Sequence, residues 1–419
     1  SYQQVVMQIP ELAPDLLDLL PLYTTCLTEF GVGDKDYAEV QTWQAQISGG
    51  VNCFSSIHSD LQDVQKTHAL LTFSSKSLVR NHAALTELLN ATVAQVRFDE
   101  DQRLRELIEQ ICARKESSIT AQGHGLAISL ASSRMSPAAH LSYCAGGLAG
   151  IQGLKVLRDK MADADERSKV LERFAQLHRA IVQADTQFLL IAEKQHQDQV
   201  LAELAGVWES QSNDSGGSHL SLPPIREGTR QAWTTSTQVN FCAKAYATVA
   251  SGHEDNATLH VLAGFMRNGF LHRAIREQGG AYGGGAGQDA NSASFRVFSY
   301  RDPRLTETLD DFDRAVDWVI SGSHSPRQLE EAILGVIAAM DKPSSPAGEA
   351  KQAFYNRLFG RTLAHRMNFR MAVLGTTIAN LKTTAARYFD PSTASIGVIS
   401  NRETIDAAKL DGIEVINLQ

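Results

Sequence analysis

An arginine and a tyrosine six positions apart, Arg276 and Tyr282, are the residues of this sequence whose types and spacing best suit chemistry. They flank two glycines, Gly279 and Gly280, in the segment REQGGAYG. A guanidinium and a phenol are both strong hydrogen-bond donors, so the pair could hold a peptide carbonyl or a developing oxyanion. The plainer interpretation is that the arginine complements a helix dipole and the tyrosine packs on a strand.

The elements around this pair would place both donors at a glycine-lined edge. Apolar residues at helical spacing predict a helix that ends near Arg276: Leu259, Leu262, Met266, Phe270 and Ile275. Gly279 and Gly280 would then break the helix before an extended segment that carries Tyr282. Because glycine has no side chain, another backbone could approach closely at this point.

Other chemistries find less support in the sequence. The glycine-rich stretch 279–287 could cradle a phosphate, but no G-x-x-x-x-G-K-[ST] motif is present, and these glycines follow a helix instead of a strand. No two of the thirteen histidines are four positions apart, so the zinc motifs H-E-x-x-H and H-x-x-E-H are absent. We therefore expect no metal ligands of local-motif type in this chain, although the sequence leaves a nonlocal site open.

The chain also contains an internal repeat. At an offset of 225 residues the repeat pairs Phe73 with Phe298, and each copy has the pattern of a strand, a polar turn, a helix, a short break and a second helix. The helical pairs at this offset are Leu104 with Leu329, Ile108 with Ile333, and Ile111 with Val336.

Only the second copy of the repeat carries the two donors. At an offset of 230, which a change in loop length would explain, Arg276 corresponds to Gln46 and Tyr282 to Asn52. A stretch rich in Ser, Gly and Pro at residues 211–228 is typical of a linker. We therefore predict an α+β fold of two related domains, residues 1–210 and 229–419, each a mainly antiparallel sheet with helices packed on one face.

Composition excludes several classes of partner. A net charge of -8 and a pI of about 5.9 argue against a nucleic-acid-binding surface. No run of 18 apolar residues is present, so we expect no membrane partner. Five scattered cysteines indicate reduced thiols, which favours a soluble protein of a reducing compartment such as the cytoplasm or an organelle matrix. The chain begins at Ser1 without a methionine, which fits either a processed protein or a piece of a longer one.

Several segments together resemble one known family. They are REQGGAYG with the preceding FLHRAI, DKPSSP at 341–346, FYNRLFG at 354–360, and, in the first domain, the sequence from Leu19 to Val51. Across nearly the whole chain, they resemble the C-terminal half of the insulinase/pitrilysin family of inverted-motif zinc peptidases, in its presequence-protease branch.

The resemblance implies a function and a set of roles. Members of this family are built of four similar α/β domains whose two halves close around an unfolded peptide, and this chain is similar to the third and fourth domains. Their zinc ligands lie in the N-terminal half, which would be the partner of this chain, so the chain alone is expected to bind no zinc and to be inactive. The family's substrate-anchoring arginine and transition-state tyrosine match Arg276 and Tyr282, with Gly279 and Gly280 beside the substrate. The alternative is a non-catalytic scaffold or peptide-binding subunit of the same fold.

Overall fold

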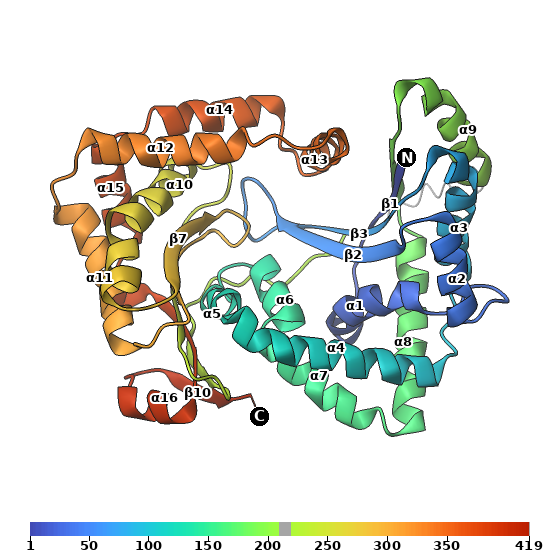
Figure 1. The fold of residues 1–419 in the computed structure, drawn as a ribbon, viewed down its shortest axis with the longest axis horizontal. Coiled ribbons are helices and arrows are strands. Elements are labelled where there is room, and N and C mark those ends of the chain that lie inside the picture. The colour runs from blue at the N-terminus through green and yellow to red at the C-terminus, as the bar shows by residue number, and fades with distance from the viewer. Residues whose placement is uncertain (209–218, 419) are drawn as a thin grey trace.

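The protein, a computed structural model, is described over residues 1–208 and 219–418, and its two halves lie side by side (Figure 1). The first half contains, in chain order, β1 (Tyr2–Gln8), α1 (Pro14–Cys26), η1 (Leu27–Glu29), α2 (Tyr37–Ile47), β2 (Val51–Ser59), β3 (Thr67–Lys76), η2 (Val79–Asn81), α3 (His82–Gln95), α4 (Asp101–Ala121), α5 (Gly123–Ala131), α6 (Pro137–Gly146), α7 (Leu148–Lys160), α8 (Ala164–Val182), β4 (Thr186–Ile191), η3 (Lys194–His196) and α9 (Gln197–Trp208).

The second half contains β5 (Arg230–Thr234), β6 (Phe241–Ala247), α10 (Asp255–Met266), η5 (Arg267–Gln278), β7 (Gly283–Asp289), β8 (Ser294–Tyr300), α11 (Thr306–Ser321), α12 (Pro326–Met340), α13 (Pro346–Leu358), α14 (Leu363–Leu374), α15 (Ile378–Tyr388), η6 (Pro391–Thr393), β9 (Ser395–Ser400), α16 (Arg402–Ala408) and β10 (Glu414–Asn417). The element η5 is a π-helix, and the other η elements are 3-10 helices. Among the described residues, no helix is both long and apolar enough to cross a membrane.

Local sequence explains where helices begin. Ser325 precedes α12, and its hydroxyl accepts a hydrogen bond from the Gln328 N–H while the Gln328 side chain accepts one from the Ser325 N–H. Pro326 occupies the first turn, where its missing N–H leaves no donor unpaired. Asp36 and Glu39 form the same reciprocal pair at the start of α2. Such caps satisfy N–H groups that have no partner within the helix.

The two sheets share a strand order. The first sheet has the order β2-β3-β1-β4 and is antiparallel throughout. The second has the order β10-β5-β9-β6-β8-β7, in which β7-β8-β6-β9 repeats the four-strand order of the first sheet. The additional strands β5 and β10 are parallel to their neighbours. The predicted α+β class with two related, mainly antiparallel sheets is therefore confirmed.

A hydrophobic core fills the space between each sheet and the helices of its own half. In the first half, Leu71 and Phe73 of β3 pack with residues of α1, α3, α4 and α8. In the second half, Phe295 and Val297 of β8 pack with residues of α10, α11, α12 and α15. In each half the core holds that half's four-strand unit and its helices together.

The opposite face of each sheet is covered by a helix from the other half, which the sequence did not indicate (Figure 1). Helix α5 of the first half packs on the second sheet, where Ala127 and Leu130 meet Phe241 and Ile399. Helix α13 of the second half packs on the first sheet, and Tyr355 Oη donates a hydrogen bond to Gln4 Oε1 at 3.2 Å. The two helices follow equivalent helices, α4 and α12, so the exchange is reciprocal.

The register of the strand part of the repeat needs a correction. Phe73 lies in the core of its own half, whereas its predicted counterpart Phe298 faces the exchanged helix α5 on the other side of the second sheet. Adjacent strand residues point to opposite faces, so an error of one residue reverses the face. An offset of 224 instead pairs Phe73 with Val297, which is in the second core. The predicted helical pair Leu104 and Leu329 faces the corresponding cores, as the offset of 225 requires.

The predicted linker, residues 211–228, lies partly outside the described residues, which stop at Trp208 and resume at His219. Within its described part, the Arg226 guanidinium donates to the carbonyl oxygens of Met135 and Thr248 at 2.7 and 2.6 Å, so this end of the segment is bonded to both halves. The boundaries 1–210 and 229–419 remain predictions.

We expect Gly397→Ala to destabilise the protein by about 1–3 kcal/mol, because overpacking of a filled interface forces its atoms apart. A Cβ at Gly397 in β9 would stand 2.5 Å from the carbonyl oxygen of Ala127 and 2.9 Å from the amide nitrogen of Ala131, both in α5. Urea unfolding measures the change. The matched control is Gly335→Ala on α12, where a Cβ meets nothing within 4 Å, and stability should be unchanged or rise by up to about 1 kcal/mol. Equal midpoints for both variants would contradict the close contact between α5 and the second sheet.

Candidate functional site

Arg276 lies in the last turn of the π-helix η5, which continues α10 and ends at Gln278, two residues beyond the predicted end. The arginine side chain is exposed. Its guanidinium has no hydrogen-bond or ion-pair partner within residues 1–208 and 219–418. Since π-helices in proteins are uncommon and frequent at functional sites, the segment is consistent with a binding role.

Two glycines make the turn that follows Arg276. Gly280 has a φ of +79°, in the left-handed region that favours glycine, and its N–H donates to the Arg276 carbonyl at 3.1 Å. The Ala281 N–H donates to the Ile275 carbonyl at 3.1 Å, which closes the turn. The first half has the same device, because Gly50, which matches Gly280 at the offset of 230, has a φ of +102°.

Tyr282 follows this turn directly, immediately before β7, and the residue is 69% exposed. Its N–H donates to the Arg301 carbonyl at 3.3 Å, and its ring meets the ring of Tyr300 edge-on at 5.5 Å between centroids. A tyrosine that served only to fill a core would be buried, so this exposure disfavours the packing interpretation. The turn therefore carries an exposed guanidinium at one end and an exposed phenol at the other.

An ion pair between the half-buried Arg304 and the buried Asp311 supports the turn, and no sequence motif indicates it. The Arg304 guanidinium donates to Asp311 at 2.9 Å and to the Ala274 carbonyl at 3.2 Å. Arg304 also fills the space that a side chain at position 279 would need, since a Cβ on Gly279 would overlap its Nη2. Arg304 thus holds the end of the π-helix in place through its hydrogen bond to Ala274. The sequence places Arg304 in the segment RDPR just after β8, but nothing in that segment indicates its partner Asp311.

Close to this ion pair, Asp302 is fully buried two residues after the end of β8. Burial raises the pKa of its carboxyl group, while hydrogen bonds from the Arg304 N–H at 3.0 Å and the Thr308 hydroxyl at 2.8 Å partly oppose that effect. The Asn240 side chain donates to the Asp302 carbonyl at 3.1 Å. These contacts hold the β8 end in place under the turn.

The strand β7 is a free sheet edge beside the two donors. Within the described part of the chain, β7 lies at the end of the second sheet and pairs with β8 alone. Because Tyr282 donates toward β8, and alternate residues of an antiparallel strand point the same way, Gly283, Gly285 and Gly287 turn their N–H and C=O groups away from β8. The edge can therefore add an extended peptide next to Arg276 and Tyr282.

No group of three or more His, Cys, Asp or Glu side chains in the described part of the chain is arranged to hold a metal ion. All five cysteines are free thiols. The chemistry available at this turn is therefore hydrogen-bond donation, with backbone pairing along β7.

The fold and the edge site together define a class of protein, and comparison with known families identifies it. A family model for the segment associated with subfamily C of the M16 peptidases matches residues 1–157, and the model described as "PreP C-terminal domain" matches residues 230–395, so the two together cover more than half of the chain. The chain belongs to the M16, or insulinase, peptidase family and corresponds to the C-terminal half of a presequence-protease-type member.

Curated relatives are longer than this chain. The chain is similar to "Presequence protease, mitochondrial" of Yarrowia lipolytica, with 26% identity over 419 residues that cover 99% of this chain and 42% of the relative. It is also similar to "Presequence protease 1, chloroplastic/mitochondrial" of Arabidopsis thaliana, with 26% identity covering 97% and 38%. The chain thus spans about two fifths of the length of these relatives.

Solved structures show the same fold at lower identity. The peptidase M16 inactive domain from Pseudomonas fluorescens superposes with a TM-score of 0.63 and 14% identity, over 96% of this chain and 92% of that one. Pitrilysin superposes with a TM-score of 0.61 and 14% identity, over all of this chain and 43% of that one.

Proposed function

We propose that this chain is the substrate-holding half of a zinc metalloendopeptidase that degrades unfolded peptides in a closed chamber. The observation that carries the proposal is one glycine turn beside the edge strand β7, where Arg276 and Tyr282 are exposed and their polar groups have no side-chain partner among the described residues. The names of the relatives support the peptidase class, since each is called a presequence protease. Substrates would pair with β7 as an added strand.

Each of the two side chains has a distinct role in this proposal. The Tyr282 phenol donates its O–H to the oxyanion that develops on the scissile carbonyl. Arg276 donates to a backbone carbonyl of the bound peptide and so fixes its register on the edge. Gly280 is exposed and has no side chain, so it leaves room for the substrate backbone, whereas the space beside the buried Gly279 is filled by Arg304.

The described residues of this chain do not fit a catalytic zinc site, which needs three protein ligands. Ligands for zinc would have to come from another part of the enzyme, the N-terminal half that is the proposed partner. This chain contributes hydrogen-bond donors for the substrate and one wall of the chamber.

The proposed compartment is a reducing one, the cytoplasm or an organelle matrix. All five cysteines are free, and the relatives are named for mitochondria and chloroplasts. The net charge of -8 would favour peptides that carry positive charge, through long-range attraction.

We expect the 419-residue chain alone to retain no stoichiometric zinc after dialysis and to cleave no unfolded peptide. The same chain joined to the N-terminal half should retain zinc and cleave the peptide. The reason is the lack of a three-ligand cluster among the described residues. Metal analysis and a quenched-fluorescence peptide assay measure the two properties. One tightly held zinc per isolated chain, or chelator-sensitive cleavage by it, would overturn the proposal.

A second candidate is a non-catalytic peptide-binding subunit of the same fold. It is favoured by the match to a solved structure titled an inactive domain. In that case, the chain joined to the N-terminal half would bind peptides, and removal of the Tyr282 hydroxyl would not change the rate at which they are cleaved.

A further inference from the structure

The first half holds two adjoining cavities that the proposed function does not use. The larger, about 550 Å³, lies among α1, α4, α6 and α7, and the smaller, about 370 Å³, lies among α1, α6 and β2. Four residues line both cavities, which therefore adjoin and together are called the groove: Leu17, Pro21, Leu141 and Ala145. Neither cavity is lined by Arg276 or Tyr282.

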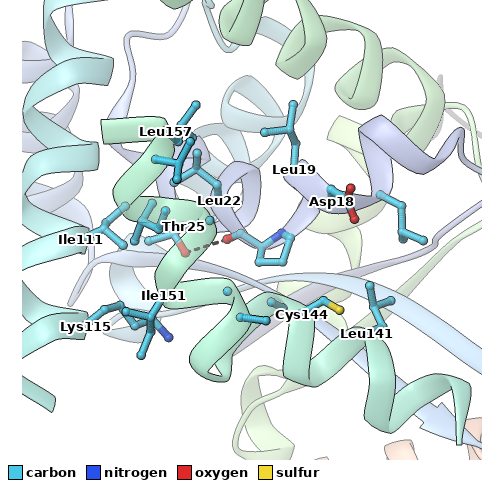
Figure 2. Close-up of a pocket in the computed structure, with 18 of the residues that line it drawn as sticks. Asp18, Leu19, Leu22, Thr25, Ile111, Lys115, Leu141, Cys144, Ile151 and Leu157 are labelled. Carbon is cyan, nitrogen blue, oxygen red and sulfur yellow. Dashed lines mark hydrogen bonds between the residues drawn. The ribbon is translucent and has the colours of Figure 1, made fainter. Parts of the chain in front are cut away.

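The larger cavity is mainly apolar. Its lining residues come from α1, α4, α6 and α7, and Figure 2 shows Leu22, Ile111 and Leu157 among them. Three charged residues also line it, Asp18, Lys115 and Lys160, and the described residues offer none of them an ion-pair partner. Two ammonium groups against one carboxylate leave an excess of positive charge, which favours an occupant with a carboxylate.

The smaller cavity lies along the free edge of β2, the end strand of the first sheet. The N–H groups of Val51 and Ser59 point away from β3, since they donate to the side chains of Gln44 and Asn291 at 3.4 and 2.6 Å. The pairing of β2 with β3 is continuous from Val51 to Ser59, so every second residue between them points the same way.

By this alternation Ser55 and Ile57 turn their N–H and C=O groups away from β3. Both residues line the smaller cavity, and in the described part of the chain those backbone groups have no hydrogen-bond partner. An unpaired strand edge is a template for one more strand. The groove therefore offers two backbone pairs to an extended chain, with an apolar cavity beside them.

We propose that this groove is a second peptide-binding site, which holds an extended apolar peptide on the β2 edge. The bound peptide places a large apolar side chain in the larger cavity, shown in Figure 2, and its carboxylate lies near Lys115. The inference rests on the proposed function insofar as the occupants are its peptide substrates. Its location on the edge of the first sheet separates it from the β7 edge of the second sheet.

The test is equilibrium binding of a fluorescein-labelled peptide of alternating leucine and serine, with either a free C-terminal carboxylate or an amide. Binding is followed by fluorescence anisotropy on the 419-residue chain. Because this readout needs neither hydrolysis nor zinc, failure of peptide binding in this assay can be distinguished from failure of the proposed peptidase function. The acid peptide should bind more tightly than the amide, and Lys115→Met should abolish the difference.

Two variants probe the groove itself. Ser55→Pro removes an outward N–H without loss of a bond to β3, and it should weaken peptide binding at least about fivefold, as expected for one lost hydrogen bond and a blocked approach. Ala145→Leu occupies the junction of the two cavities and should weaken binding about tenfold. The control Ala407→Leu adds the same atoms to an exposed position of α16 and should change binding by less than about twofold.

Other outcomes would overturn the proposal. If dodecanoate competes with the peptide and Ser55→Pro binds the peptide as the unmodified chain does, the cavity takes a lipid-like carboxylate and not a strand. Equal binding of the acid and amide peptides would remove the role of Lys115. If Arg276→Ala abolishes binding while Ala145→Leu does not, the peptide occupies the β7 edge.

Discussion

Tyr282→Phe, measured in the enzyme that combines this chain with its N-terminal half, is expected to lower kcat by about 10²–10³-fold and to change KM little. The phenol in the proposed role donates to an oxyanion that exists only in the transition state, so its removal affects the chemical step and not ground-state binding. Steady-state kinetics on an unfolded peptide measure both constants. The 69% exposure of Tyr282 makes a folding defect a poor explanation for such a loss.

The control for this variant is Tyr37→Phe, at a half-buried tyrosine of α2 whose hydroxyl has no hydrogen-bond partner among the described residues. It deletes the same oxygen far from the turn and should leave kcat unchanged. If Tyr282→Phe keeps the unmodified kcat while it folds correctly, the catalytic role is wrong, and the peptide-binding subunit becomes the better interpretation.

The fold class was predictable from the sequence because helices and strands have local sequence patterns, and because these patterns occur in the same order in both halves. Helical periodicity and capping residues such as Ser325 mark where elements begin, and the 225-residue offset relates the two halves. The face of a strand is less secure, since one residue separates the core position Val297 from Phe298, and both are apolar. Periodicity alone could not choose between them.

The exchange of α5 and α13 was not predictable for a related reason. A helix with an apolar stripe reports that the stripe is buried, but not against which sheet. The close contact of Gly123 with the Phe241 ring, which a Cβ at Gly123 would overlap, depends on residues far apart in the chain. Only the assembled structure brings such residues together.

The candidate site was predictable in part. Two glycines after a helix predicted the turn, and Gly280 does adopt the left-handed conformation. The supporting Arg304–Asp311 ion pair was not predicted, because an arginine and an aspartate seven positions apart carry no distinctive pattern. Whether Arg276 and Tyr282 act in catalysis remains a prediction that kinetics must test.

Arg276→Ala in the same enzyme is expected to lower kcat/KM by about 10–100-fold, with effects on both kcat and KM. A charged hydrogen bond to a substrate carbonyl contributes about 1.5–3 kcal/mol and exists before and during the reaction, so its loss weakens substrate binding and also misplaces the scissile bond. Arg276→Lys should recover only part of the activity, because an ammonium keeps the charge but not the planar pair of donors.

The matched control for Arg276 is Arg273→Ala, three residues earlier in the same π-helix. It removes an exposed guanidinium that has no ion-pair partner among the described residues. If Arg276 acts only through general positive charge or through the helix dipole, the two alanine variants should lose similar, small amounts of activity and Arg276→Lys should be fully active. If Arg276 donates a hydrogen bond to the substrate, only Arg276→Ala should raise KM. The loss of kcat/KM should then be larger for peptides long enough to reach past β7. A small and equal loss from Arg276→Ala and Tyr282→Phe would instead mean that the exposed turn is part of a scaffold.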